Sequence, residues 1–87
     1  QQLEAGEFIN VLSSINGQRV IVRYKLNGTG NRLLTSLYNS EGKILLENRM
    51  LSDGEAINIS NYSAGIYVLK FISSSTKKVY VHKFLKQ

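Results

Sequence analysis

Apolar and polar residues alternate along much of the chain, and no stretch keeps the 3.6-residue period of an amphipathic helix. The clearest alternation lies in residues 19–26. There, one face would carry Val20, Val22, Tyr24 and Leu26, and the other Arg19, Ile21, Arg23 and Lys25. Because successive side chains of a strand point to opposite faces, this pattern predicts a strand with one buried side.

Six further strands are predicted between turn signals, in residues 8–12, 32–39, 43–51, 55–61, 65–72 and 77–86. Ser40-Glu41-Gly42 predicts a three-residue hairpin loop with Gly42 in the left-handed region. Asn16-Gly17 and Ser52-Asp53-Gly54 are further turns, after which Ile57 and Ile59 would point inward. Residues 65–72 are apolar on both faces, which predicts a central, well-covered strand.

Seven short strands with short connections predict an all-β fold, a seven-stranded antiparallel immunoglobulin-like β-sandwich. A barrel is the alternative. We find no internal repeat and no linker, so residues 1–87 are expected to form one domain.

Gly65 stands two residues before Tyr67, at the start of the predicted central strand. In immunoglobulin-like sandwiches, a tyrosine at this place donates its hydroxyl to a backbone group a few residues upstream. We therefore expect Tyr67 to bury its ring and hydrogen-bond upstream. We expect Gly65 to adopt a backbone conformation that is costly for a residue with a Cβ.

The composition limits the available chemistry. There is no cysteine, which excludes disulfides, thiolate zinc sites and thiol nucleophiles. No apolar run reaches the roughly 20 residues of a membrane-spanning helix. Residues 1–8 carry two acids and no basic residue, so they are not a secretory signal peptide, and the leader of an exported protein would lie upstream.

The net charge of +5 is unevenly distributed, because all six acids fall in the first 55 residues. The last 18 residues carry Lys70, Lys77, Lys78, Lys83 and Lys86. A basic strand with aromatic residues could bind a nucleic acid, but stacking on bases requires exposed rings. Tyr80, His82 and Phe84 share one face, and we expect that face to be buried, so no nucleic-acid partner is predicted.

Catalytic chemistry finds little support in the sequence. His82 is the single histidine and has no acid within several residues, so local sequence assembles neither a triad nor a metal cluster around it. We interpret His82 as a partly exposed sheet residue. The chain is predicted to be a non-enzyme without a cofactor or a metal.

Residues 32–87 resemble the type A C-terminal sorting domain of proteins exported by the type IX secretion system of Bacteroidota-type bacteria. The matching residues are Leu37, Tyr38, Gly42 and Lys43, then Ile57 to Ser60, then Gly65, Ile66, Tyr67 and Leu69, and finally Lys83, Phe84 and Lys86. The order and spacing of these parts carry the resemblance. The chain departs from the family in having no proline, where members usually carry a proline-asparagine-proline element near the first strand.

The resemblance implies a signal that directs a folded parent protein across the outer membrane to the cell surface or beyond, where a sortase-like peptidase often removes it. The implied partners are the secretion and sortase proteins of the outer membrane, and the oligomeric state stays open. Candidate recognition residues are Gly65, Tyr67, Lys77, Lys78, Lys83, Phe84 and Lys86. The lysines have an alternative interpretation as solubilising charges on an edge strand.

Two other functions stay open at this point. One is a non-catalytic accessory domain that binds protein or carbohydrate. The other is a sorting-like domain within a component of the secretion apparatus, since the chain lacks the proline element that members of the family usually carry.

Overall fold

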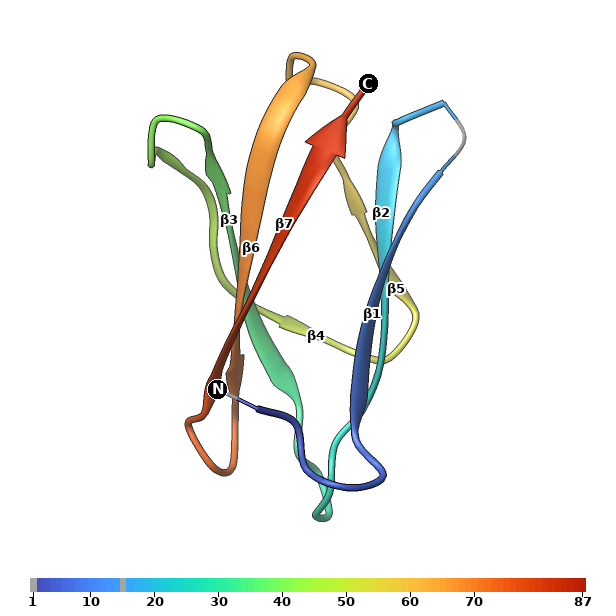
Figure 1. Ribbon diagram of the computed structural model, residues 1–87, viewed down its shortest axis with the longest axis vertical. Coiled ribbons are helices and arrows are strands. Elements are labelled where there is room, and N and C mark those ends of the chain that lie inside the picture. The colour runs from blue at the N-terminus through green and yellow to red at the C-terminus, as the bar shows by residue number, and fades with distance from the viewer. Residues whose placement is uncertain (1, 15) are drawn as a thin grey trace.

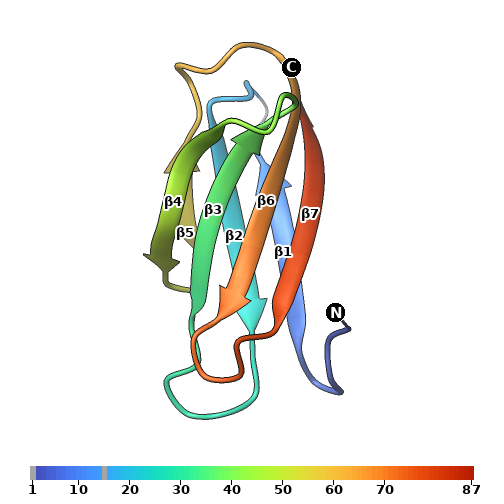
Figure 2. The ribbon, with the colours of Figure 1, turned by 90° about the vertical axis from the view of Figure 1, so that its left-hand side faces the viewer.

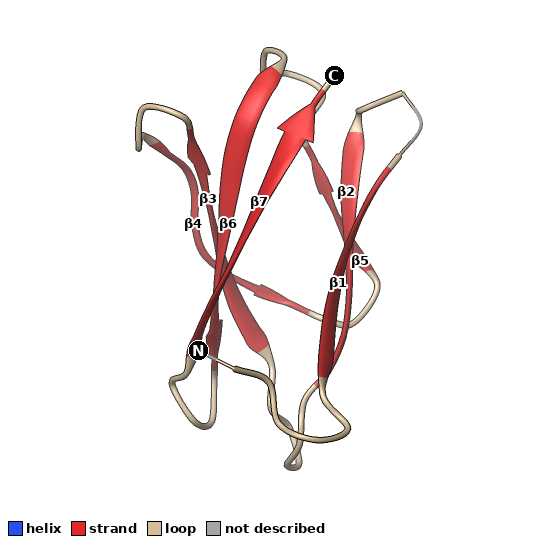
Figure 3. Cartoon of the chain, in the orientation of Figure 1, coloured by secondary structure: helices blue, strands red, loops and turns tan. Residues whose placement is uncertain are grey.

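Seven strands in two sheets make up the computed structural model, which describes residues 2–14 and 16–87 (Figure 1). The strands are β1 (Phe8–Ser13), β2 (Arg19–Lys25), β3 (Leu33–Asn39), β4 (Ile44–Leu51), β5 (Glu55–Asn58), β6 (Gly65–Ser73) and β7 (Val79–Lys86). Loops and turns join them, and the described residues contain no helix (Figure 3). Within those residues, nothing helical could therefore span a membrane.

One sheet has the strand order β1-β2-β5 and the other β4-β3-β6-β7, with antiparallel pairing throughout. The two sheets pack face to face, as the two views show (Figures 1 and 2). Each sheet keeps two edge strands, so the fold is an open sandwich and not the alternative barrel. The prediction of an all-β, immunoglobulin-like sandwich is confirmed.

The core lies between the sheets and draws on strands from both. The predicted inward face of β2 is confirmed, because Val20, Val22 and Tyr24 are buried and Leu26 packs against the core. Ile57 and Ile59 are also buried, as expected. The other buried apolar residues are Leu33, Leu37, Leu51, Tyr67, Leu69, Phe71 and Tyr80. Burying each large apolar side chain contributes about 1.5–3 kcal/mol, so the packing of these two faces dominates stability.

β6 occupies the predicted central position, between β3 and β7, but the prediction that both of its faces are covered is wrong. Its inward residues Tyr67, Leu69 and Phe71 are buried, whereas Ile66 on the outward face is 41% exposed. Two sheets can cover only one face of each other. The apolar outward residues of β6 therefore remain at the surface.

The last strand begins at Val79, two residues later than predicted. Lys77 has a φ of +64°, which a regular strand does not have, and its backbone N–H donates to the Ser73 carbonyl at 2.9 Å. This geometry is that of a turn. Lys77 and Lys78 therefore belong to the β6–β7 connection and not to β7.

The predicted hairpin between β3 and β4 is confirmed. The Asn39 N–H donates to the Lys43 carbonyl at 3.0 Å, which closes a three-residue loop, and Gly42 has a φ of +84°. The Asn39 side chain accepts hydrogen bonds from the backbone N–H groups of Glu41 and Lys43, both at 2.9 Å. One asparagine thus satisfies two loop amides that strand pairing leaves free.

Two contacts tie the sheets together where the chain crosses from β4 to β5. The Tyr24 hydroxyl of β2 donates to the Leu51 carbonyl of β4 at 2.5 Å, within the core. Beside it, Asp53 Oδ1 accepts from the Tyr24 N–H at 2.8 Å and from Arg23 Nε at 3.0 Å. These hydrogen bonds lower the pKa of Asp53 below its ordinary value of 3.8, with the Tyr24 amide as the larger cause.

The predicted tyrosine corner is confirmed. The Tyr67 hydroxyl donates to the Ser63 carbonyl at 2.5 Å, and the residue is only 5% exposed. Gly65 has a φ of +149°, a region that residues with a Cβ rarely adopt. The glycine therefore lets the chain bend into β6, and the tyrosine holds that bend in place.

Replacing Tyr67 with Phe should lower the free energy of unfolding by about 1 kcal/mol, because the hydroxyl loses its bond to the Ser63 carbonyl. Urea denaturation followed by circular dichroism measures the effect. Tyr38→Phe is the matched control, since Tyr38 is half-buried and its hydroxyl makes no hydrogen bond with the described residues. Equal midpoints for Tyr67→Phe and the parent would contradict the corner bond.

Asp53→Asn should destabilise the domain at neutral pH and less so in acid. A carboxylate with a lowered folded-state pKa contributes stability above its unfolded pKa of about 3.8, and this contribution is lost as pH falls through the folded-state pKa. The difference in free energy of unfolding between parent and variant should therefore narrow below pH 3.8. Urea titrations at a series of pH values measure it, with Glu41→Gln controlling for the loss of one carboxylate. A difference that stays constant into acid would refute the role of Asp53.

Candidate functional site

β7 lies at the edge of the four-stranded sheet and pairs with β6 on one side only. The pairing is regular over the whole strand, from Gly65 opposite Lys86 to Ile72 opposite Val79, without a register shift. From Tyr80 to Lys86, the backbone N–H and C=O groups that point away from β6 have no strand partner among the described residues. Such a row of donors and acceptors is a template for a further strand.

The other three edges are less suited to pairing. β5 is only four residues long and β1 has six. β4 has eight residues but two irregularities in its register with β3, and Asn48 has a φ of +50°. Bulges and short lengths are the usual protections of an edge strand. Among the four edges, β7 is therefore the longest regular one.

The N-terminal segment lies against the first half of β7 (Figure 1). Leu3 lines a hollow of about 210 Å³ together with Tyr80, Val81 and His82, and Glu4 Oε2 lies 3.3 Å from Lys78 Nζ. Burial raises the pKa of Tyr80, and the negative charge of Glu7 adds to the effect. The half of β7 from Lys83 onward is beyond this contact.

Four of the seven candidate recognition residues meet at the far end of β7. Phe84 stacks on Tyr67, with ring centroids 5.8 Å apart and planes 24° from parallel. The ring of Tyr62 also lies beside that of Tyr67, with the two centroids 6.1 Å apart. Lys86 lies directly opposite Gly65 in the β6–β7 ladder. The tyrosine corner therefore also holds the second half of β7 against β6.

The remaining three candidates do not join this group. Lys77 and Lys78 lie at the opposite end of the strand, where Lys77 Nζ donates to the Ser74 carbonyl at 2.8 Å. Lys83 is on β7, but its exposed side chain is on the outer face, opposite Val68 in register. The predicted recognition set is thus divided between two ends and two faces of the strand.

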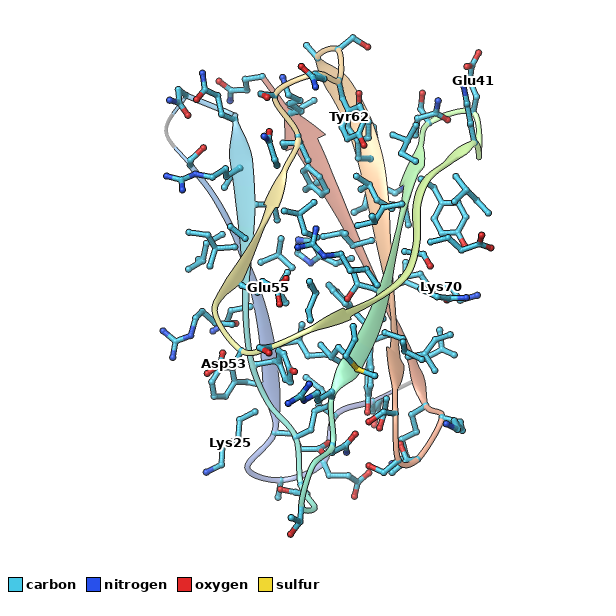
Figure 4. All side chains as sticks on the ribbon, turned by 180° about the vertical axis from the view of Figure 1, so that it is seen from behind. Lys25, Glu41, Asp53, Glu55, Tyr62 and Lys70 are labelled. Atoms are coloured by element: carbon cyan, nitrogen blue, oxygen red, sulfur yellow. The ribbon has the colours of Figure 1, made fainter. Side chains whose placement is uncertain are left out.

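A hollow of about 320 Å³ adjoins the aromatic cluster, and the sequence analysis did not anticipate it. Its lining comes from the β3–β4 hairpin, with Glu41, and from the β5–β6 loop, with Tyr62. Figure 4 shows these two residues at the same end of the sandwich. The closeness of two turns 20 residues apart depends on sheet topology. No local pattern in the sequence indicates it.

The aromatic residues of β7 face the core as predicted. Tyr80 is buried, and Phe84 is half-buried and packs against the core. His82 is half-buried opposite Leu69. In the described parts of the chain, no three His, Asp or Glu residues come together in a way that could hold a metal ion. The geometry offers an edge for backbone pairing, not an exposed set of stacking rings.

In a comparison with known protein families, residues 16–87 match a family with the description "Secretion system C-terminal sorting domain". Searches of curated proteins and of solved structures found no match. The matched region includes six of the seven strands, the hairpin, the tyrosine corner and the edge strand. The chain belongs to the family of C-terminal sorting domains of the type IX secretion system.

Proposed function

We propose that this domain is a sorting signal that the type IX secretion apparatus recognises through the free edge of β7, and that it directs a folded parent protein across the outer membrane. The observation that carries the proposal is the regular edge of β7 in a chain of this family. A signal needs a feature that a receptor can bind without unfolding the cargo. An unpaired strand edge on a folded sandwich meets that need.

Recognition proceeds by strand addition. A receptor segment aligns along β7 and pairs with the backbone groups that point away from β6, so that affinity comes largely from main-chain hydrogen bonds. Pairing occupies the half from Lys83 to Lys86, which lies beyond the N-terminal segment. The stacked rings of Tyr67 and Phe84 keep this half ordered before binding, which reduces the entropy lost on association.

The lysines guide the encounter. Lys83 and Lys86 flank the pairing segment and attract an acidic receptor, while they also oppose pairing between two copies of the domain. Lys77 and Lys78 are already engaged, by the Ser74 carbonyl and the Glu4 carboxylate. We assign recognition to the first pair and a structural role to the second.

The domain acts without chemistry of its own. Its half-buried His82 has an apolar residue opposite it in the ladder, which supports a role in the sheet. Removal of the domain at the cell surface would be the work of a separate sortase-like peptidase acting upstream of the sandwich. The proposed localisation of the parent is the cell surface or the extracellular space.

Deleting residues 83–87 should abolish export, because the pairing segment is lost. The experiment fuses the chain behind a folding reporter in a bacterium that has the type IX system, and compares reporter at the surface with reporter in the periplasm. Circular dichroism of the purified variant checks that the sandwich persists. Export at the parental level would reject the proposal.

Removing the lysine charges at the two ends of β7 in separate variants should affect the export rate unequally. Lys83→Gln with Lys86→Gln should slow export several-fold, because lost steering charges reduce the association rate. Lys77→Gln with Lys78→Gln removes the same charge from the other end and should leave the export rate nearly unchanged. The rates come from pulse-chase measurements on the fusion. Equal defects in both double variants would contradict the assignment of recognition to the far end.

A further inference from the structure

The outer face of the four-stranded sheet is apolar and uncovered. Figure 2 views this face directly, with β4, β3, β6 and β7 in front of the other sheet. Its most exposed apolar residues are Val81 at 68%, Leu85 at 57%, Ile44 at 45%, Met50 at 43% and Ile66 at 41%. Leu34, Tyr38, Val68, Ile72 and Val79 lie between them and are half-buried.

The register places these residues in rows across the strands. Leu34 lies opposite both Met50 and Ile72, and Tyr38 lies opposite both Ile44 and Val68. Four strands of about eight residues, about 4.8 Å apart and rising about 3.3 Å per residue, cover roughly 500 Å² of flat area. That area includes the polar residues of the face, and it is comparable to the largest apolar patch of a typical monomer, about 300–600 Å², which is often an interaction site.

Two lysines stand on this apolar face. Lys70 is on the inner strand β6, opposite Ser36 and Val81, and Lys83 is on the edge strand β7, opposite Val68. Neither forms an ion pair with the described residues. The four strands contain one acid, Glu47, which is on β4 at the far edge of the sheet. Among the described residues, no carboxylate therefore pairs with Lys70 inside the face or with Lys83 at its β7 edge.

The position of the lysines decides among possible occupants. In a two-fold dimer through this face, the lysines of both copies would meet in an interface that excludes water, and like charges there are costly. A patch that binds a lipid surface typically has its basic residues at the rim, where they reach the headgroups. Here Lys70 lies within the patch, on the inner strand β6, and half of the apolar residues are half-buried between neighbours. Carboxylates fixed at matching positions on a protein satisfy this arrangement.

We propose that the outer face of this sheet docks a separate protein whose contacting surface is apolar and carries carboxylates opposite Lys70 and Lys83. The contact is distinct from strand addition, because it uses side chains of all four strands and not the backbone of the β7 edge. The partner buries the apolar rows, and its carboxylates provide the ion pairs that the domain itself does not supply.

Site-specific photo-crosslinking tests this docking. A benzoylphenylalanine at position 50, on the strand farthest from the β7 edge, is placed in the reporter fusion and irradiated in cells that have the type IX system. We expect an adduct with one other protein, lost in the Lys70→Glu background and retained in Lys25→Glu. Lys25 is an exposed residue of the other sheet, on the opposite side of the sandwich from Lys70 (Figure 4). A probe at Leu12, which is 52% exposed on β1, should give no such adduct.

Charge reversal completes the test. Peptide mapping identifies the partner carboxylate nearest to the crosslink, and changing it to lysine should restore the adduct with Lys70→Glu. Absence of an adduct would overturn the proposal, as would an adduct unaffected by Lys70→Glu. So would an adduct of two copies of the chain, a crosslink to the reporter, or Lys70-dependent binding of the purified domain to phosphatidylglycerol vesicles. Lys86→Gln in the same cells separates the two surfaces, because Lys86 is at the proposed pairing end of β7 but lies opposite Gly65 and not on the outer face. Slower export with the adduct retained would leave both assignments standing.

Discussion

The structure depends on one constraint: a strand at the edge of a sheet satisfies only half of its backbone hydrogen bonds. The sandwich cannot remove its four edges, and three of them are shortened or interrupted. β7 is neither, and it stays regular over eight residues. In a family of sorting domains, we propose that this difference makes β7 the strand that a receptor recognises. The features that make β7 prone to association are the ones that a receptor requires.

The rest of the domain keeps that edge in a defined position. Packing between the two inner faces fixes β6 in the centre of its sheet, and β6 in turn fixes the register of β7. The corner at Tyr67 anchors the start of β6, and Phe84 stacks on the same ring. The hydroxyl of Tyr24 and the carboxylate of Asp53 hold the two sheets together at the β4–β5 crossover. The core thus presents an ordered strand without covering it.

Much of this arrangement was predictable from the sequence. Period-two alternation in several segments, together with the turn signals between segments, predicted all seven strands. Gly42 predicted the hairpin, and the spacing of Gly65 and Tyr67 predicted the corner. The parts that were not predicted depend on tertiary position. Apolar residues on both faces of β6 suggested burial on both sides, yet a two-layer fold has nothing to cover the outer face. Residue pattern alone places Lys77 in the last strand, whereas its positive φ places it in a turn. The turn at Lys77 places Lys77 and Lys78 outside β7. On β7 itself, Lys83 lies on the outer face and Lys86 lies on the other face, opposite Gly65.

Amide hydrogen exchange along β7 tests the central claim most directly. In the free domain, the amides between Lys83 and Lys86 that point away from β6 should exchange rapidly, while those of the central strand β3 stay protected. When purified components of the type IX apparatus bind, protection should rise on those β7 amides, most of all between Lys83 and Lys86. The contradicting result is binding that leaves β7 exchange unchanged and protects the edge of β1 or β5 in its place.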